Sequence, residues 1–332
     1  MADKLTVVLS QSQNKHPARR GLEEDIATQL LMEKDVVVSV IPHLYDINEK
    51  HTAMLFLRSI ESDVVVLSWL YPRAAHWMLD RYQVKGHIGD VLLKDDEDDE
   101  GMEDTDDEGS GIGAADLPDR HIYTIDLRVS DRHEDYLEEI RRIAKESKDR
   151  SQAQKAASQL GFVSIDSVTS TNGEGKVRQE LMAPTRRRWY PVIDFNRCTN
   201  CMECIDFCLF GVYGVDNIDR ILVENPDNCK KGCPACSRVC PEQAIIFPEY
   251  RSPEIAGANL GGIGGLKIDL TKLFGGGDAV STAASERDAE LVKDGRDAVG
   301  WAVGIPKRQE GIESEPKDEL DDLMDSLEDV EI

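Results

Sequence analysis

Residues 198–208 read CTNCMECIDFC and residues 229–241 read CKKGCPACSRVCP, and these two short runs hold all eight cysteines of a 332-residue chain. The first run has the spacing C-x2-C-x2-C-x3-C, and the second has C-x3-C-x2-C-x3-C followed by Pro241. A [4Fe–4S] cluster needs one thiolate at each of its corner irons, and cysteines three residues apart in a loop can reach three of them. The spacing therefore predicts iron–sulfur clusters, with the fourth ligand of each supplied from elsewhere.

The two runs resemble those of the bacterial two-cluster ferredoxins, in which the fourth cysteine of each run binds the other cluster. The resemblance covers residues 187–250 and implies two [4Fe–4S] clusters, one held by Cys198, Cys201, Cys204 and Cys240, the other by Cys229, Cys233, Cys236 and Cys208. The second run departs from the family pattern because its first spacing is one residue longer, and Leu209 follows the first run where proline is common.

Two other uses of eight cysteines remain open, namely all-cysteine zinc sites and a disulfide framework. Zinc sites usually pair two C-x2-C knuckles across a longer loop and do not require three cysteines at successive i+3 steps. Disulfides are disfavoured because the chain shows no secretory segment. Free cysteines without an export signal predict a cytoplasmic location.

Short apolar strands are expected on both sides of the cysteine runs, at 190–194 and 244–247, with a hairpin formed by 212–215 and 220–223 between them. A unit this small has little room for a core, so the clusters themselves are expected to hold it folded. The residue pattern indicates a small α+β domain of the bacterial ferredoxin type. Its apolar sheath is expected to consist of Ile193, Phe195, Ile205, Phe207, Phe210, Ile245 and Phe247.

The first 147 residues alternate short apolar strands with amphipathic helices. Strands are expected at 5–9, 36–41, 64–67 and 122–127, and helices at 21–33, 49–61, 73–82 and 135–145. This alternation predicts an α/β domain with a doubly wound parallel sheet of flavodoxin or Rossmann type. Trp69, Tyr71 and Trp77 follow the third strand and are expected either in its core or on a surface against which the cysteine-rich domain rests.

The organisation we expect is an α/β domain over 1–147 with an acidic insertion at 94–113, a linker over 148–186, the two-cluster domain over 187–250, and a glycine-rich and acidic tail over 251–332. A short helix is expected in this tail at 285–293. The net charge of −25 is concentrated in two tracts, 95–108 and 310–331, each with 11 acidic residues. Such tracts are typical of disordered, solvated segments, or they dock a basic redox partner. Nucleic acid is disfavoured as a partner because phosphate binding needs a basic face. No apolar run is long enough to span a membrane.

These features favour an electron carrier with two [4Fe–4S] clusters and redox partner proteins. The sequence indicates no catalytic residue, and a carrier role is favoured over that of an enzyme. Two alternatives remain. In one, the α/β domain of an oxidoreductase or its subunit binds a substrate or cofactor; in the other, the protein is an iron–sulfur redox sensor.

Overall fold

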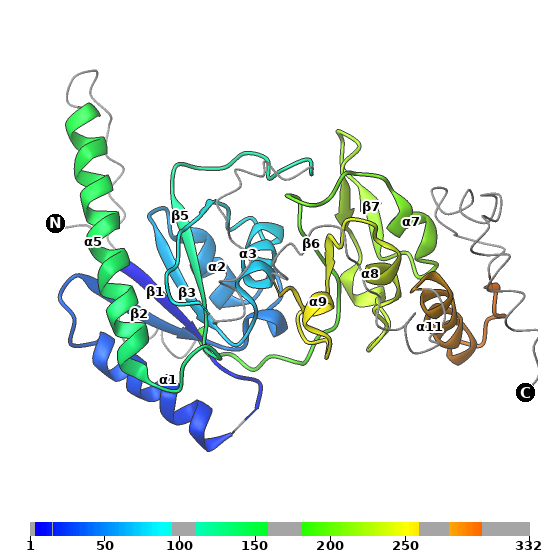
Figure 1. Ribbon diagram of the computed structural model, residues 1–332, viewed down its shortest axis with the longest axis horizontal. Helices are drawn as coiled ribbons and strands as arrows, with labels where there is room; N and C mark the ends of the chain where they lie inside the picture. The colour runs from blue at the N-terminus through cyan, green and yellow to red at the C-terminus, as the bar shows by residue number, and fades with distance from the viewer. Residues whose placement is uncertain (1–3, 15, 95–110, 159–180, 259–278, 301–332) are drawn as a thin grey trace, which may run out of the picture.

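The computed structural model describes residues 4–14, 16–94, 111–158, 181–258 and 279–300. Figure 1 shows two parts side by side, an α/β domain that runs from β1 to α5 and a cysteine-rich domain (residues 187–250), with α11 on the far side of the second part. The central tract of the predicted acidic insertion, most of the predicted linker, and residues 301–332 of the predicted acidic tail lie outside the described residues.

The α/β domain is built on a parallel sheet, as predicted. Its strands are β1 (Leu5–Ser10), β2 (Val36–Ile41), β3 (Val64–Ser68), β4 (His87–Ile88) and β5 (His121–Asp126). They are ordered β2-β1-β3-β5-β4, and every pairing is parallel. All five residues of the central strand β3 are buried, as expected where helices cover both faces of a sheet. The strand β4 was not predicted, because two residues are too few to show a strand pattern.

Helices cover both faces of this sheet. The helices α1 (Pro17–Leu30) and α5 (His133–Ser158) pack on one face against Val7, Leu9 and Val65. The helices α2 (Thr52–Ser59) and α3 (Pro72–Arg81), together with the 3-10 turn η1 (Leu44–Asp46), pack on the other face against Val8, Val64 and Val66. Successive side chains of a strand point to opposite faces, which is why neighbouring valines of one strand belong to different cores. The helix α5 continues well beyond its predicted end at residue 145.

The cysteine-rich domain contains the strands and the hairpin that the sequence predicts. The strand β6 (Val192–Ile193) pairs antiparallel with β9 (Ile245–Ile246), and β7 (Tyr213–Val215) pairs antiparallel with β8 (Ile221–Val223). The carboxylate of Asp216 accepts the backbone N–H groups of Ile218 and Arg220 and closes the hairpin turn. The remaining elements of this domain are α7 (Glu203–Phe207), η2 (Pro226–Asn228) and α8 (Ala235–Val239), and α9 (Pro253–Ala256) follows it directly.

The two domains share one hydrophobic core. Tyr190, Val192 and Ile246 of the cysteine-rich domain belong to the same buried cluster as the side chains of α2 and α3. Trp77 of α3 is 2% exposed, and its ring meets that of Phe195 edge-on at 5.7 Å. The expectation that Trp77 lies either in the core or against the cysteine-rich domain therefore resolves as both.

The predicted tail contains α11 (Ala279–Lys293), which begins six residues before the helix expected at 285–293. It packs against α8, and Ala283 joins a small apolar cluster with Phe207, Ala235 and Val239.

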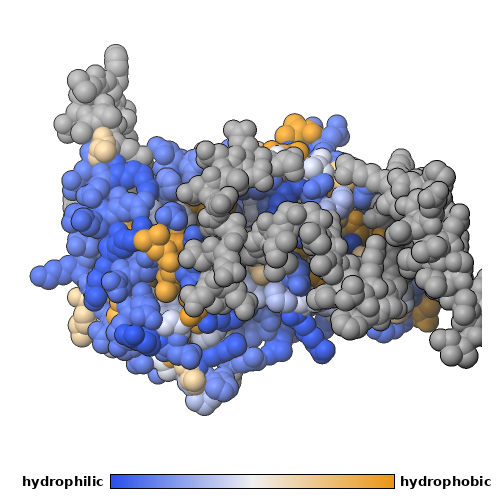
Figure 2. Space-filling view, viewed as in Figure 1, coloured by the Kyte–Doolittle hydropathy of each residue, from blue (hydrophilic) through white to orange (hydrophobic). Residues whose placement is uncertain are grey.

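Figure 2 shows one face of the molecule. On this face, the described surface of the α/β domain is largely hydrophilic, with a small apolar patch. Among the described residues, no helix is long and apolar enough to cross a membrane.

Candidate iron–sulfur centre

The two cysteine loops reverse direction at residues with positive φ. Asn200 and Met202 have φ of 58° and 65° in the first loop, and Asn200 is held by hydrogen bonds to the Asp219 C=O and from the Ile221 N–H. Gly232, in the longer spacing of the second loop, has φ of 87°, a conformation that glycine adopts without steric cost. The extra residue is thus absorbed by a tight turn, which lets Cys229 stay with the other cysteines of its loop.

All eight cysteines lie in the described ranges, and all are free thiols. Cys198, Cys204 and Cys236 are buried, and the other five are partly buried. Six of the eight pack into or against one apolar cluster with Ile193, Tyr213 and Phe247. A dry environment of this kind is one of the features that set the reduction potential of an iron–sulfur cluster.

The thiols of Cys198, Cys201, Cys204 and Cys240 form one electrostatic group. Burial raises the pKa of Cys204 well above its usual value, and the neighbouring thiols of Cys240, Cys198 and Cys201 raise it further. Burial also raises the pKa of Cys198, and Cys240 and Cys201 again contribute to the rise. The last cysteine of the second run therefore interacts electrostatically with the first three cysteines of the first run.

The thiols of Cys208, Cys229, Cys233 and Cys236 form a second group. Burial raises the pKa of Cys236 well above its usual value, followed by the effects of Cys208, Cys229 and Cys233. Burial raises the pKa of Cys233 to about 11, with Cys208 among the contributing charges. We call Cys208 and Cys240 the crosswise cysteines, because each of them raises the pKa values of cysteines in the other run.

Hydrogen-bond donors point at several of these sulfurs. The Ala244 N–H donates to Cys240 Sγ at 3.2 Å, and the N–H groups of Glu242 and Ile245 also lower the pKa of this thiol, although burial raises it more. The Tyr213 hydroxyl donates to Cys236 Sγ at 3.1 Å. Such donors favour the thiolate over the thiol, and a thiolate is the form that binds iron.

The apolar sheath surrounds these thiols at the positions that the sequence suggested. Ile193, Phe207, Ile245 and Phe247 are buried, while Phe195, Ile205 and Phe210 are partly buried and pack on the same core. Within the described residues, no three His, Cys, Asp or Glu side chains gather closely enough to hold a single metal ion. The thiolates around a cubane bind separate corner irons, so they surround a larger object than a lone ion. The donor set, the grouping in fours and the dry surroundings fit a [4Fe–4S] cluster in each group.

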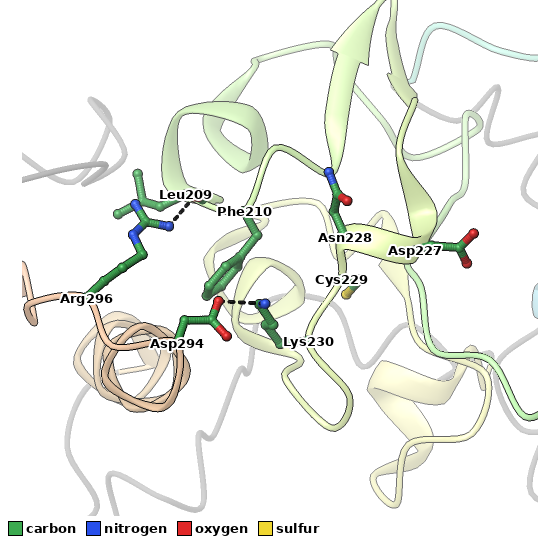
Figure 3. Close-up of a pocket in the computed structure, with 8 residues that line it drawn as sticks. All are labelled: Leu209, Phe210, Asp227, Asn228, Cys229, Lys230, Asp294 and Arg296. Atoms are coloured by element: carbon green, nitrogen blue, oxygen red, sulfur yellow. Dashed lines mark hydrogen bonds and ion pairs between the residues drawn. The ribbon is translucent and has the colours of Figure 1, made fainter.

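A surface pocket of about 350 Å³ reaches Cys229 (Figure 3). Its lining residues are Leu209, Phe210, Asp227, Asn228, Cys229, Lys230, Asp294 and Arg296. One wall is tied to the end of α11, since Asp294 pairs with Lys230 at 2.6 Å and Arg296 donates to the Leu209 C=O at 3.0 Å. The pocket opens the second group of thiols toward the surface.

Two buried arginines beside the cysteine-rich domain, Arg73 on α3 and Arg287 on α11, were not predicted as functional residues. A signal for Arg287 was present, because it falls in line with Val280, Ala283, Ala284 and Leu291 on one face of the helix. No comparable signal existed for Arg73, which meets the cysteine-rich domain only through the fold.

Comparisons with known proteins cover part of the chain. An uncharacterized ferredoxin of Methanocaldococcus jannaschii is 45% identical over 80 residues, which make up 24% of this chain and 50% of the relative. The chain thus spans about half the length of the curated relative that it matches. No protein-family model matches the chain, and no solved structure gives a significant match. These findings support a ferredoxin segment in this chain, and the family of the N-terminal domain is not identified.

Proposed function

We propose that this chain is an electron-transfer protein that carries two [4Fe–4S] clusters. Cys198, Cys201, Cys204 and Cys240 would hold the first, and Cys229, Cys233, Cys236 and Cys208 would hold the second. The observation that carries the proposal is the crosswise grouping of the thiols, in which each run supplies three members of one group and one of the other. The ferredoxin relative supports the same function.

When bound, each cubane accepts and returns one electron. The surrounding residues exclude water, aim hydrogen-bond donors at sulfur and keep the two loops together. The pocket at Cys229 supports an approach of redox partner proteins on that side, because this thiol is the one that the pocket reaches.

The first test is the cofactor content of the intact chain, purified without oxygen. We expect about eight iron and eight sulfide per chain, with the visible and electron paramagnetic resonance (EPR) spectra of two cubanes. A colourless, zinc-loaded protein would overturn the proposal.

The crosswise ligation is tested by combining cysteine substitutions. Cys208→Ser and Cys236→Ser each remove a ligand of the second cluster, so the double variant should lose about four irons, no more than Cys236→Ser alone. Cys204→Ser combined with Cys208→Ser removes one ligand from each cluster, so this double variant should lose about eight irons. If the first double variant loses about eight irons and the second about four, each run of four cysteines binds its own cluster.

We also propose that the α/β domain is of the flavodoxin type. The order β2-β1-β3 at the start of the sheet supports a flavodoxin-like domain, in which the first strand lies between the second and third. A cytoplasmic location stays a prediction, based on the reduced state that eight free thiols require. The alternatives, a substrate-binding oxidoreductase subunit or a redox sensor, also stay predictions. A bound flavin or nucleotide in the purified chain would favour the first of them.

A further inference from the structure

Each crosswise cysteine has a buried arginine nearby, and each arginine comes from a part of the chain outside the cysteine runs. Arg287 belongs to α11 and lies over the ring of Phe207, which precedes Cys208, while Arg73 belongs to α3 and donates to the peptide group whose N–H contacts Cys240 Sγ. The two arginines are 1% and 8% exposed. Fully buried arginine is rare in proteins, so two of them beside two groups of thiols call for an explanation.

Arg287 lies on the buried face of α11, whose other buried residues are apolar. Its guanidinium lies over the ring of Phe207, the residue before Cys208, with 4.6 Å between Cζ and the ring centroid. Its Nη2 donates to the Gly300 C=O at 2.6 Å, and its Nε lies 3.1 Å from the Asp288 carboxylate. The buried cation therefore lies beside the residue that immediately precedes the crosswise cysteine Cys208.

Arg73 has the corresponding position beside the loop that contains Cys240. Its Nε donates to Asp194 at 2.5 Å and its Nη2 to the Gln243 C=O at 2.6 Å, while the Gln243 N–H donates to the Cys240 C=O. The Gln243 C=O belongs to the same peptide group as the Ala244 N–H, which donates to Cys240 Sγ at 3.2 Å. One peptide group thus links the guanidinium of Arg73 to the sulfur of the other crosswise cysteine.

We infer that Arg73 and Arg287 set the reduction potentials of the two clusters separately, each through one crosswise cysteine. This inference rests on the proposed function. Reduction adds one negative charge to a cluster, and a nearby buried cation stabilises the reduced form more than the oxidised form. The α/β domain then controls the potential of the first cluster through α3, and α11 controls that of the second.

The test uses the full chain, with both midpoint potentials followed by EPR during an anaerobic redox titration. Arg287→Gln removes the cation and should make one midpoint more negative, while the other stays unchanged. Asp288→Asn removes a negative charge beside the cation and should move the same midpoint in the positive direction. Because the second shift has the opposite sign, the inference stays testable even if Arg287→Gln fails to assemble.

Two controls separate a local effect from a general one. Arg287→Lys keeps the charge and should restore most of the potential, and Lys293→Gln removes a solvent-exposed charge from the same helix and should shift neither midpoint. Asp194→Asn is the matched variant for the first cluster and should raise the midpoint that Asp288→Asn leaves unchanged.

Unchanged midpoints in Asp288→Asn with full iron content would overturn the inference. Equal shifts of both midpoints in Arg287→Gln or in Asp288→Asn would also overturn it. A shift in Lys293→Gln as large as that in Arg287→Gln would also overturn it. If the unsubstituted chain lacks two [4Fe–4S] signals, the proposed function itself fails. If it shows both signals and the variants do not move them, only the role of the two arginines is lost.

Discussion

The hydroxyl of Tyr45 makes two hydrogen bonds between the two domains, and its removal tests whether the domains unfold together. It donates to the Tyr190 C=O at 2.6 Å and accepts from the Tyr190 N–H at 2.7 Å, across 145 residues of sequence. Burial raises the pKa of Tyr45 well above its usual value, so the hydroxyl stays protonated and able to donate. Tyr45→Phe keeps the buried ring and deletes only this double contact.

The expected cost follows from the groups that are left behind. Both backbone groups of Tyr190 lie in the shared core, where Tyr190 is 0% exposed, and Tyr45→Phe leaves both without the Tyr45 hydroxyl. A buried backbone group without a partner costs about 1–3 kcal/mol, so the free energy of unfolding should fall by about 3 kcal/mol in total. Tyr123→Phe is the matched control, because its ring is also buried but its hydroxyl binds the partly exposed Arg150. The control should lose less than about 1 kcal/mol.

The assay is anaerobic urea unfolding of the intact chain, followed both by far-ultraviolet circular dichroism and by the visible absorbance of the clusters. Because the domains share one core, the two signals should change together in the unsubstituted protein, and both midpoints should fall in Tyr45→Phe. A loss no larger than that of Tyr123→Phe, or a fall in only one signal, would refute the coupling.

Two further predictions concern buried histidines and a close backbone contact. Burial lowers the pKa of His43 and of His76 to about 4, with Arg187 and Arg19 adding to the effect at His43. A histidine in the unfolded chain has a pKa of about 6.5. The stabilising effect of the neutral buried rings is therefore complete above that pH and is lost as the pH falls toward about 4. The free energy of unfolding should fall by about 3 kcal/mol for each ring over this range. Urea midpoints between about pH 7 and pH 5 should fall less steeply in His43→Gln, and an unchanged slope would contradict this reasoning. Gly111→Ala should destabilise the first cysteine loop, because a Cβ atom there would lie 2.4 Å from the Phe195 carbonyl oxygen, whereas Gly21→Ala meets nothing within 4 Å and serves as the control. The measurement is the rate of iron loss in air, and equal rates in the two variants would contradict the prediction.

Part of this protein could be read from local sequence because the relevant physics is local. The three closely spaced cysteines of each run lie within a loop of a few residues, and the apolar strands of the sheet are recognised within five or six residues. The hairpin of β7 and β8 was predictable for the same reason, since Asp216 satisfies backbone groups two and four residues away.

Other features depend on contacts between distant parts of the chain. Arg73 and Asp194 are 121 residues apart in sequence, and Tyr45 and Tyr190 are 145 apart, so no periodicity or spacing links them. The sequence also left open whether Trp77 belongs to a core or to an interface, because both require the same apolar side chain. Packing of α3 against β6 decided that it belongs to both.

The cysteine spacing by itself determined which chemistry the chain can support, because thiolate ligands must come at short, regular intervals. Only the tertiary structure decided which charges lie beside the thiols, because Arg73 lies on α3 and Arg287 on α11, two helices that are far from the cysteine runs in sequence. Electrostatic interactions strengthen where water is excluded, and the exclusion of water is a property of the folded core.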